Sequence, residues 1–209
     1  MTEISKWLSG NSDDSDPNDP VVLLLHGYGS NEHDLPGLVR FLPGNRRWFS
    51  LRAPVELGGG YFAWANRVTP GNPPAPEVEL ATEAIWKWVD KNLSPETPLV
   101  PIGFSQGGLM VTQLLRTKPH RIAAAAVLAG FTLAAEQPAD ELLTREQPEV
   151  IYCRGLQDEV ISAEAVQRTL TWLKSHTTPR IKTYDGLGHS IDERVMEDVA
   201  DYLIAKFRA

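Results

Sequence analysis

The sequence predicts an α/β fold, in which a mainly parallel central sheet is flanked by helices. Two observations support this prediction. Short apolar runs bounded by turn residues recur along the chain, and segments with helical periodicity lie between them. Strands that alternate with helices build parallel sheets. The length of 209 residues and the hydrophobic content of 42% suit one domain with a sizeable core.

Six runs are expected to form the strands. Each is short and mostly apolar, which is typical of a strand that is buried on both faces. In chain order they are VVLLLHG (21–27), RWFSLRA (47–53), PLVPIGF (98–104), AAAVLAG (124–130), EVIYCRG (149–155) and RIKTYDG (180–186).

Helices are expected between these runs, where apolar residues repeat every three or four positions. The repeat is clear at residues 77–93, at residues 162–174 and near the C-terminus. The last helix has the best-marked start, because Ser190 and Glu193 have the spacing of a capping box ahead of an apolar stripe.

The first twenty residues are expected to form a flexible acidic leader, and residues 21–209 a single domain. The leader holds five acidic residues and one lysine, so −4 of the net charge of −7 lies there. The charged residues are Glu3, Lys6, Asp13, Asp14, Asp16 and Asp19.

Composition excludes several classes of partner. No run of Lys or Arg appears, so we expect neither a nucleic-acid partner nor an anionic membrane surface. The longest apolar run, IAAAAVLAG, is about half the length of a membrane span, and the N-terminus lacks the features of a signal peptide. The one cysteine, Cys153, excludes an internal disulfide and suits a reducing compartment. The expected location is therefore cytoplasmic, with no integral membrane segment.

The stretch GFSQGG contains the first candidate for catalysis. Ser105 comes directly after the strand 98–104 and before a helical segment, with glycines on both sides. A G-x-S-x-G pattern in this context places a serine on a strained strand-to-helix turn with its hydroxyl exposed. The N–H of Gln106 then opens the helix and faces any oxyanion that forms beside Ser105. A nucleophile is favoured here over a purely structural turn.

A nucleophilic serine needs a histidine base, and His189 has the expected position. In proteins whose serine lies on such a strand-to-helix turn, the acid and then the histidine follow the serine, each on a loop after a later strand. His189 lies between the strand 180–186 and the last helix. Of the other histidines, His120 and His176 are expected at the surface and His26 in a structural role. His26, His33 and Asp34 lack a metal-binding spacing, so no metal and no cofactor is expected.

The acid is expected to be Asp158, one short loop after the strand 149–155. Asp185 and Asp140 are its rivals. Asp185 ends the strand that precedes the histidine and could be a simple turn former, while Asp140 has no strand directly before it.

Two further segments are expected near the serine. LHGYGS (25–30) ends the first strand, and the N–H of Tyr28 could be a second oxyanion donor beside Gln106. The loop 57–76 holds Tyr61, Phe62 and Trp64, and it is too long for a plain connector. Its aromatic side chains could pack under the loop or wall a pocket, and the residues alone do not decide between the two.

With these motifs in place, the chain resembles the phospholipase/carboxylesterase family of small α/β-hydrolases. The resemblance rests on six ordered stretches: LHGYGSNEHDL, LRAP, GGYFAW, GFSQGG, GLQDEVI and GLGHSI. It implies an α/β-hydrolase fold and a triad of Ser105, Asp158 and His189. It also implies oxyanion donors at Tyr28 and Gln106, and a substrate pocket walled by Tyr61, Phe62 and Trp64.

The expected function is hydrolysis of carboxylic esters through an acyl-enzyme. Only residues 131–148 separate two successive strands where larger relatives carry a cap, so no cap domain is expected. An open site suits short or medium acyl esters, thioesters or lysophospholipids, as small molecules or on a larger acyl carrier. The alternatives are a peptidase with the same triad and a non-catalytic binding protein of this fold. Whether the chain forms a homodimer stays open.

Overall fold

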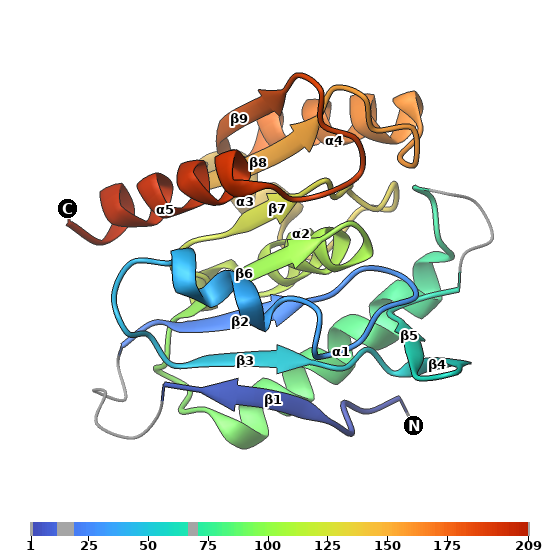
Figure 1. Ribbon diagram of the computed structural model, residues 1–209, viewed down its shortest axis with the longest axis vertical. Helices are drawn as coiled ribbons and strands as arrows, with labels where there is room; N and C mark the ends of the chain where they lie inside the picture. The colour runs from blue at the N-terminus through green and yellow to red at the C-terminus, as the bar shows by residue number, and fades with distance from the viewer. Residues whose placement is uncertain (1, 12–18, 67–70, 209) are drawn as a thin grey trace.

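The computed structural model describes residues 2–11, 19–66 and 71–208. Its centre is a seven-stranded sheet in the order β1-β3-β2-β6-β7-β8-β9 (Figure 1). Every neighbouring pair is parallel except β1 and β3. The strands are β1 (Trp7–Gly10), β2 (Val21–Leu25), β3 (Trp48–Leu51), β6 (Leu99–Phe104), β7 (Ala126–Leu128), β8 (Glu149–Gly155) and β9 (Thr178–Tyr184). All six predicted strands are confirmed.

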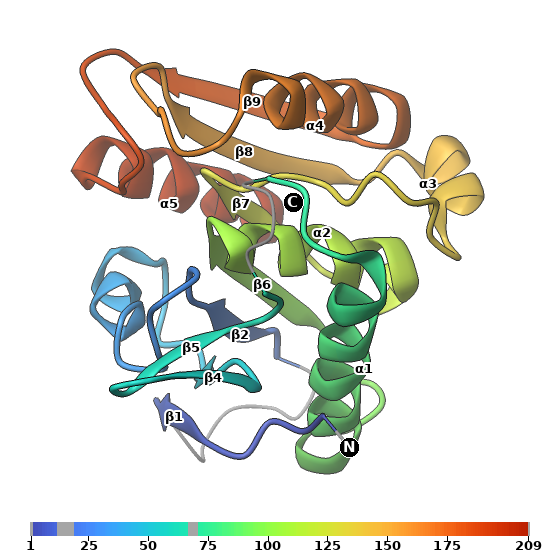
Figure 2. The same ribbon diagram turned by 90° about the vertical axis from the view of Figure 1, so that its right-hand side faces the viewer.

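Helices cover both faces of this sheet (Figure 2). One core contains residues of α1, α2 and α4, and the other contains residues of α5. The strand β2 serves both cores, because Val21 and Leu23 face one side and Val22 and Leu24 the other. The helices are η1 (Pro36–Phe41), α1 (Ala75–Asn92), α2 (Gln106–Thr117), η2 (Pro119–Arg121), α3 (Asp140–Glu146), α4 (Ala163–His176) and α5 (Glu193–Arg208).

Part of the expected leader is structured. Trp7–Gly10 forms the edge strand β1, which pairs antiparallel with β3. Ile4 is buried in the same core as Trp88 of α1, and the Trp7 ring meets the Trp88 ring edge-on at a centroid distance of 5.5 Å. Of the acidic leader residues, Asp13, Asp14 and Asp16 lie outside the described residues.

Two local predictions are corrected. The start of the loop 57–76 belongs to a hairpin of β4 (Val55–Gly58) and β5 (Tyr61–Ala63), which turns at Gly59 and Gly60, both with positive φ. The last helix begins at Glu193, and Asp192 caps it by accepting the N–H of Val195 at 3.2 Å. The cap is therefore Asp192 rather than Ser190.

Two expectations about larger features can be compared with the fold. Residues 129–148, between β7 and β8, contain only the short helix α3, so no separate cap domain is present there. In the described part of the chain, no helix is both long enough and apolar enough to cross a bilayer.

Candidate active site

Ser105 sits on a sharp turn between β6 and α2. Its φ of 55° and ψ of −115° lie in a region that a non-glycine residue rarely adopts. Its N–H donates to the carbonyl of Leu128 at 2.8 Å, which ties the turn to the end of β7. The strained strand-to-helix turn predicted from GFSQGG is therefore observed.

The glycines around Ser105 are required by close backbone packing. A Cβ atom on Gly107 would lie 1.8 Å from the carbonyl oxygen of Leu25 in β2. One on Gly103 would lie 2.2 Å from the carbonyl oxygen of Gly107. Both distances are far below van der Waals contact, so only glycine at these positions lets the start of α2 lie against the ends of β2 and β6.

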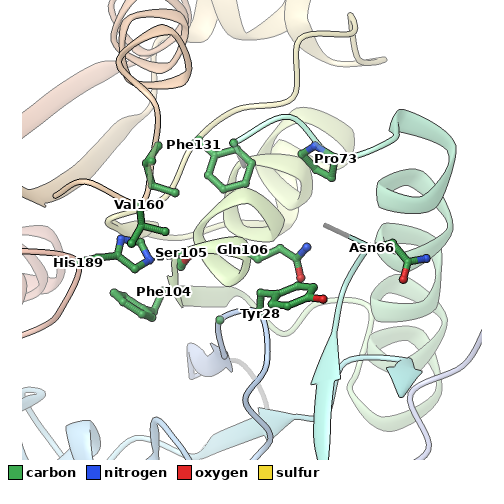
Figure 3. Close-up of a pocket in the computed structure, with 12 residues that line it drawn as sticks. Tyr28, Asn66, Pro73, Phe104, Ser105, Gln106, Phe131, Val160 and His189 are labelled. Carbon is green, nitrogen blue, oxygen red and sulfur yellow. Dashed lines mark hydrogen bonds between the residues drawn. The ribbon is translucent and has the colours of Figure 1, made fainter. Parts of the chain in front are cut away.

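Ser105, His189 and Asp158 form a continuous hydrogen-bonded chain. His189 Nε2 lies 2.8 Å from Ser105 Oγ, and His189 Nδ1 lies 2.8 Å from Asp158 Oδ2. The other carboxylate oxygen, Oδ1, accepts the N–H groups of Val160 and Ile161 at 2.9 and 3.2 Å. These bonds fix the carboxylate so that Oδ2 faces the imidazole. Figure 3 shows the imidazole beside Ser105, with Phe104 packed against it at a ring distance of 4.8 Å.

The rival residues lie in other surroundings. Asp140 forms an ion pair with Arg116 at 2.6 Å; burial alone would raise the pKa of Asp140, but the hydrogen bonds from Arg116 lower it overall. Asp185 accepts a hydrogen bond from Gln157 at 3.1 Å. His176 stacks on Trp172, and His120 is exposed. The structure thus brings Ser105 together with Asp158 and His189, and not with these four residues.

His26 is a buried histidine that fixes the chain ahead of Tyr28. Its Nε2 accepts the N–H of Ala53 at 3.1 Å, so Nδ1 carries the proton and donates to the Gly27 carbonyl at 2.7 Å. Burial lowers the pKa of His26, which favours this neutral form. In a trans peptide the N–H points away from the carbonyl, so the Tyr28 N–H is turned away from His26. The Gly27 backbone adjoins Ser105.

Gln106 supplies the second N–H predicted to face an oxyanion. It is the first residue of α2, and the first N–H groups of a helix have no partner within the helix. Its buried side chain forms two hydrogen bonds with the chain after β5. Oε1 accepts the Trp64 N–H at 2.8 Å, and Nε2 donates to the Ala65 carbonyl at 2.7 Å.

A pocket of about 200 Å³ opens beside Ser105. In Figure 3, Phe131 and Pro73 lie on one side, Tyr28 lies on the other, and Asn66 lies at the end away from His189. The lining residues are Gly27, Tyr28, Asn66, Gly71, Pro73, Phe104, Ser105, Gln106, Phe131, Val160, Ile161 and His189.

The three aromatic residues expected to wall the pocket lie elsewhere. Tyr61 is exposed, Phe62 is buried under the guanidinium of Arg52, and Trp64 is fully buried. None of the three lines the pocket beside Ser105. Tyr61 and Phe62 belong to the hairpin, and Trp64 follows it directly. Because Phe62 and Trp64 are buried, the packing alternative fits these two residues.

Other side chains line the pocket instead, and some of them could have been predicted from the sequence. Phe131 comes directly after the run 124–130, and Val160 and Ile161 follow Asp158 within its loop. Because ligands of parallel α/β sheets bind outside the carboxyl ends of the strands, these residues could have been expected in the pocket. Asn66 and Pro73 belong to the loop 57–76, which was expected near the serine, although only its aromatic residues were predicted to line the pocket.

Metal binding receives no support from the part of the chain that the structure describes. Among those residues, no group of three or more His, Cys, Asp or Glu side chains is placed to hold an ion.

The fold and the Ser105–His189–Asp158 contacts together define the class of α/β-hydrolase-fold serine hydrolases. Within this class, the chain belongs to the phospholipase/carboxylesterase family, whose model matches residues 12–206. The resemblance found in the sequence is thereby confirmed.

Related sequences agree with this assignment, and a solved structure shares the fold. Acyl-protein thioesterase 1 of Kluyveromyces lactis is 23% identical over 210 residues, which cover 90% of this chain and 92% of that protein. A probable carboxylesterase of Arabidopsis thaliana is 25% identical over 218 residues, covering 94% and 76%. The crystal structure of a Bacillus cereus carboxylesterase has a TM-score of 0.80 at 19% identity, covering 97% and 94%. Family and relatives together support a carboxylic ester hydrolase.

Proposed function

We propose that the chain hydrolyses carboxylic esters with short or medium acyl groups through an acyl-enzyme at Ser105. The observation that carries this proposal is the unbroken chain of contacts, 2.8 Å from Ser105 Oγ to His189 and 2.8 Å from His189 to Asp158. Hydrogen bonds of this length allow His189 to take the serine proton while Asp158 holds the imidazole.

In the proposed acylation step, Ser105 Oγ forms a bond to the ester carbonyl carbon as its proton passes to His189 Nε2. The carbonyl oxygen becomes an oxyanion, which accepts hydrogen bonds from the N–H groups of Tyr28 and Gln106. Each such donor commonly stabilises the transition state by about 3 kcal/mol. The tetrahedral intermediate collapses, the bond to the leaving group breaks, and His189 returns the proton to the leaving alcohol or thiol.

Deacylation repeats these steps with water as the nucleophile. His189 takes a proton from water, the hydroxide oxygen attacks the acyl-serine carbonyl, and the same two N–H groups bind the oxyanion. The bond to Ser105 Oγ then breaks, and His189 returns the proton to the serine. The products are a free carboxylic acid and the original enzyme.

The pocket indicates the class of acyl group. Its volume of about 200 Å³ is small for a ligand site, and its walls near Ser105 are the apolar side chains Phe104, Phe131, Val160 and Ile161. A short apolar acyl chain fits this space. Tyr28 and Val160 are each about two-fifths exposed, so the pocket mouth is open, and an acyl group on a larger carrier or as a thioester is also compatible.

Two further parts of the proposal concern the chain as a whole. We assign catalysis to residues 21–209, with β1 completing the edge of their sheet. We also propose a cytoplasmic location, because the one cysteine, Cys153, is buried as a free thiol.

The test is a panel of p-nitrophenyl esters of increasing acyl length, with wild type and Ser105→Ala. We expect wild-type kcat/KM to be highest for short or medium chains and turnover to vanish in Ser105→Ala. Undiminished turnover in the alanine variant would contradict the mechanism. Peptide p-nitroanilides test the peptidase alternative, which requires anilide cleavage to exceed ester cleavage.

A further inference from the structure

Trp64 lies outside the pocket, but it contacts the chain segments that carry the proposed oxyanion donors. Its side chain is completely buried. Its backbone N–H donates to Gln106 Oε1 at 2.8 Å, and its indole Nε1–H donates to the carbonyl of His26 at 2.9 Å. One residue therefore contacts both chain segments that carry a proposed donor.

The bond to Gln106 is part of a closed pair. While Trp64 donates to the Gln106 amide oxygen, the Gln106 amide nitrogen donates to the Ala65 carbonyl at 2.7 Å. The side-chain amide thus uses its acceptor and its donor on two successive backbone residues, 64 and 65. This pair ties the first residue of α2, whose N–H is a proposed donor, to the chain after β5.

The bond to His26 fixes the other segment. Trp64 holds the His26 carbonyl, while the His26 ring holds the next carbonyl, that of Gly27, at 2.7 Å. The Gly27 carbonyl belongs to the peptide unit whose N–H is that of Tyr28. The rings of His26 and Trp64 also pack together at a centroid distance of 5.6 Å. Two hydrogen bonds and one ring contact therefore limit rotation of the peptide unit between Gly27 and Tyr28.

The hairpin that immediately precedes Trp64 is itself attached to the Tyr28 loop. The N–H of Gly29 donates to the Phe62 carbonyl at 2.9 Å, and the Phe62 N–H donates to the Ser30 carbonyl at 2.8 Å. The chain that leads into Trp64 is therefore held against the Tyr28 loop by the backbone of Phe62, in addition to the indole bond to His26.

We propose that Trp64 is a positioning residue that holds the two oxyanion donors, the N–H groups of Tyr28 and Gln106, at the separation that the transition state requires. The proposal rests on the function proposed above. Donors that are already placed need no reorganisation during the reaction, and small misplacements of reacting groups reduce rates strongly. The GGYFAW stretch then shapes the catalytic site from behind instead of walling the substrate pocket.

Trp64→Phe tests this proposal. Phenylalanine keeps the backbone N–H to Gln106 and much of the ring packing, but it cannot donate to the His26 carbonyl. We expect kcat for a short p-nitrophenyl ester to fall by roughly tenfold, less than the loss of a whole donor, with KM within twofold of wild type. The inhibition constant of a trifluoromethyl ketone, whose adduct with Ser105 carries an oxyanion, should rise by a similar factor.

Trp86→Phe is the matched control. The Trp86 indole N–H donates to Thr117 Oγ1 at 2.8 Å, and Trp86 is also buried, but it packs in α1 and does not line the pocket. This variant loses a bond of the same kind, so its melting temperature should fall about as far as that of Trp64→Phe. Its kcat and its affinity for the ketone should not change.

Three results would overturn the proposal. They are an unchanged kcat in Trp64→Phe, an equal fall in kcat in Trp64→Phe and Trp86→Phe, or a rise in the KM of Trp64→Phe without a fall in its kcat. If Trp64→Phe does not fold, Gln106→Met replaces it, because it keeps the backbone N–H but removes both side-chain bonds; a wild-type kcat there would also overturn the proposal. Failure of the proposed function looks different, because wild type itself would then neither hydrolyse the esters nor react with a fluorophosphonate.

Discussion

At the scale of single residues, the proposed chemistry depends on how each polar atom of Asp158 is used. Oδ1 accepts two backbone N–H groups, and Oδ2 faces His189 Nδ1. This arrangement requires His189 to carry its proton on Nδ1, which leaves Nε2 free to accept the proton of Ser105.

Asp158→Asn should therefore reverse the tautomer of His189. The amide oxygen would keep the N–H groups of Val160 and Ile161, and the NH₂ group would face Nδ1, which must then be an acceptor. Nε2 would carry the proton and could not act as a base. We expect kcat to fall by about 10⁴, the magnitude known for the same change in other triads, as measured with p-nitrophenyl acetate. Asp185→Asn is the control and should stay within twofold of wild type.

Gly107→Ala should damage folding itself, because the new Cβ would lie 1.8 Å from the Leu25 carbonyl oxygen. We expect the free energy of unfolding to fall by about 3 kcal/mol or more, as measured by urea denaturation. Gly37→Ala is the matched control, since no atom beyond the adjoining chain lies within 4 Å of a Cβ placed there. Equal stability of the two variants would show that the turn does not rest on β2 as described.

At the scale of elements, the loop after β2 is anchored by Glu32. This buried carboxylate accepts two hydrogen bonds from Arg52, both at 2.6 Å, and lies near Lys6 and His33. Burial alone would raise the pKa of Glu32, but the bonds from Arg52 outweigh it and lower the pKa to about 2. The ion pair thus secures the chain that leads away from Tyr28.

This lowered pKa predicts acid sensitivity. Between the ordinary pKa of 4.5 and the lowered pKa of about 2, the unfolded chain binds a proton at Glu32 that the folded chain does not. The contribution of Glu32 is therefore complete above pH 4.5 and is lost as the pH falls toward 2. Glu32→Gln should reduce this part of the pH dependence, measured by denaturation across that range. Glu83→Gln removes an exposed pair with Lys87 and should leave the dependence unchanged.

The elements also show why some predictions succeeded and others did not. Strands buried on both faces left continuous apolar runs, so they could be predicted from sequence. The edge strand β1, with the sequence WLSG, alternates between exposed and half-buried positions and has no such run. The place of Trp64 depends on how β5 packs against α2 and the end of β2, which are distant in sequence, so no local pattern could predict it.

At the scale of the whole molecule, the sheet gathers the candidate site from distant parts of the chain. Ser105, Asp158 and His189 follow β6, β8 and β9, and Ser105 and His189 are 84 positions apart. Their order and loops were predictable because parallel strands end at the same edge of a sheet. The volume of the pocket was not, because it depends on side chains from several loops at once.

The edge strand β1 allows a test at this scale. A chain that begins at Asp19 lacks β1 and Ile4, and it exposes the edge of β3. We expect a lower melting temperature, because buried apolar surface and strand pairing are lost, but a kcat/KM within twofold at 25 °C because the site lies on other strands. If the shortened chain melts at the same temperature as the full chain, the whole stretch behaves as the flexible leader expected from its composition.

The identity of the acylated residue tests the proposed acyl-enzyme at Ser105 most directly. Wild type mixed with p-nitrophenyl acetate, quenched with acid within the first turnover and digested, should carry one acetyl group on the peptide that contains Ser105. Ser105→Ala should carry none and should release no burst of p-nitrophenol. The proposed mechanism would be contradicted if the acetyl group were found on a different residue and formed and decayed there as fast as the ester is hydrolysed.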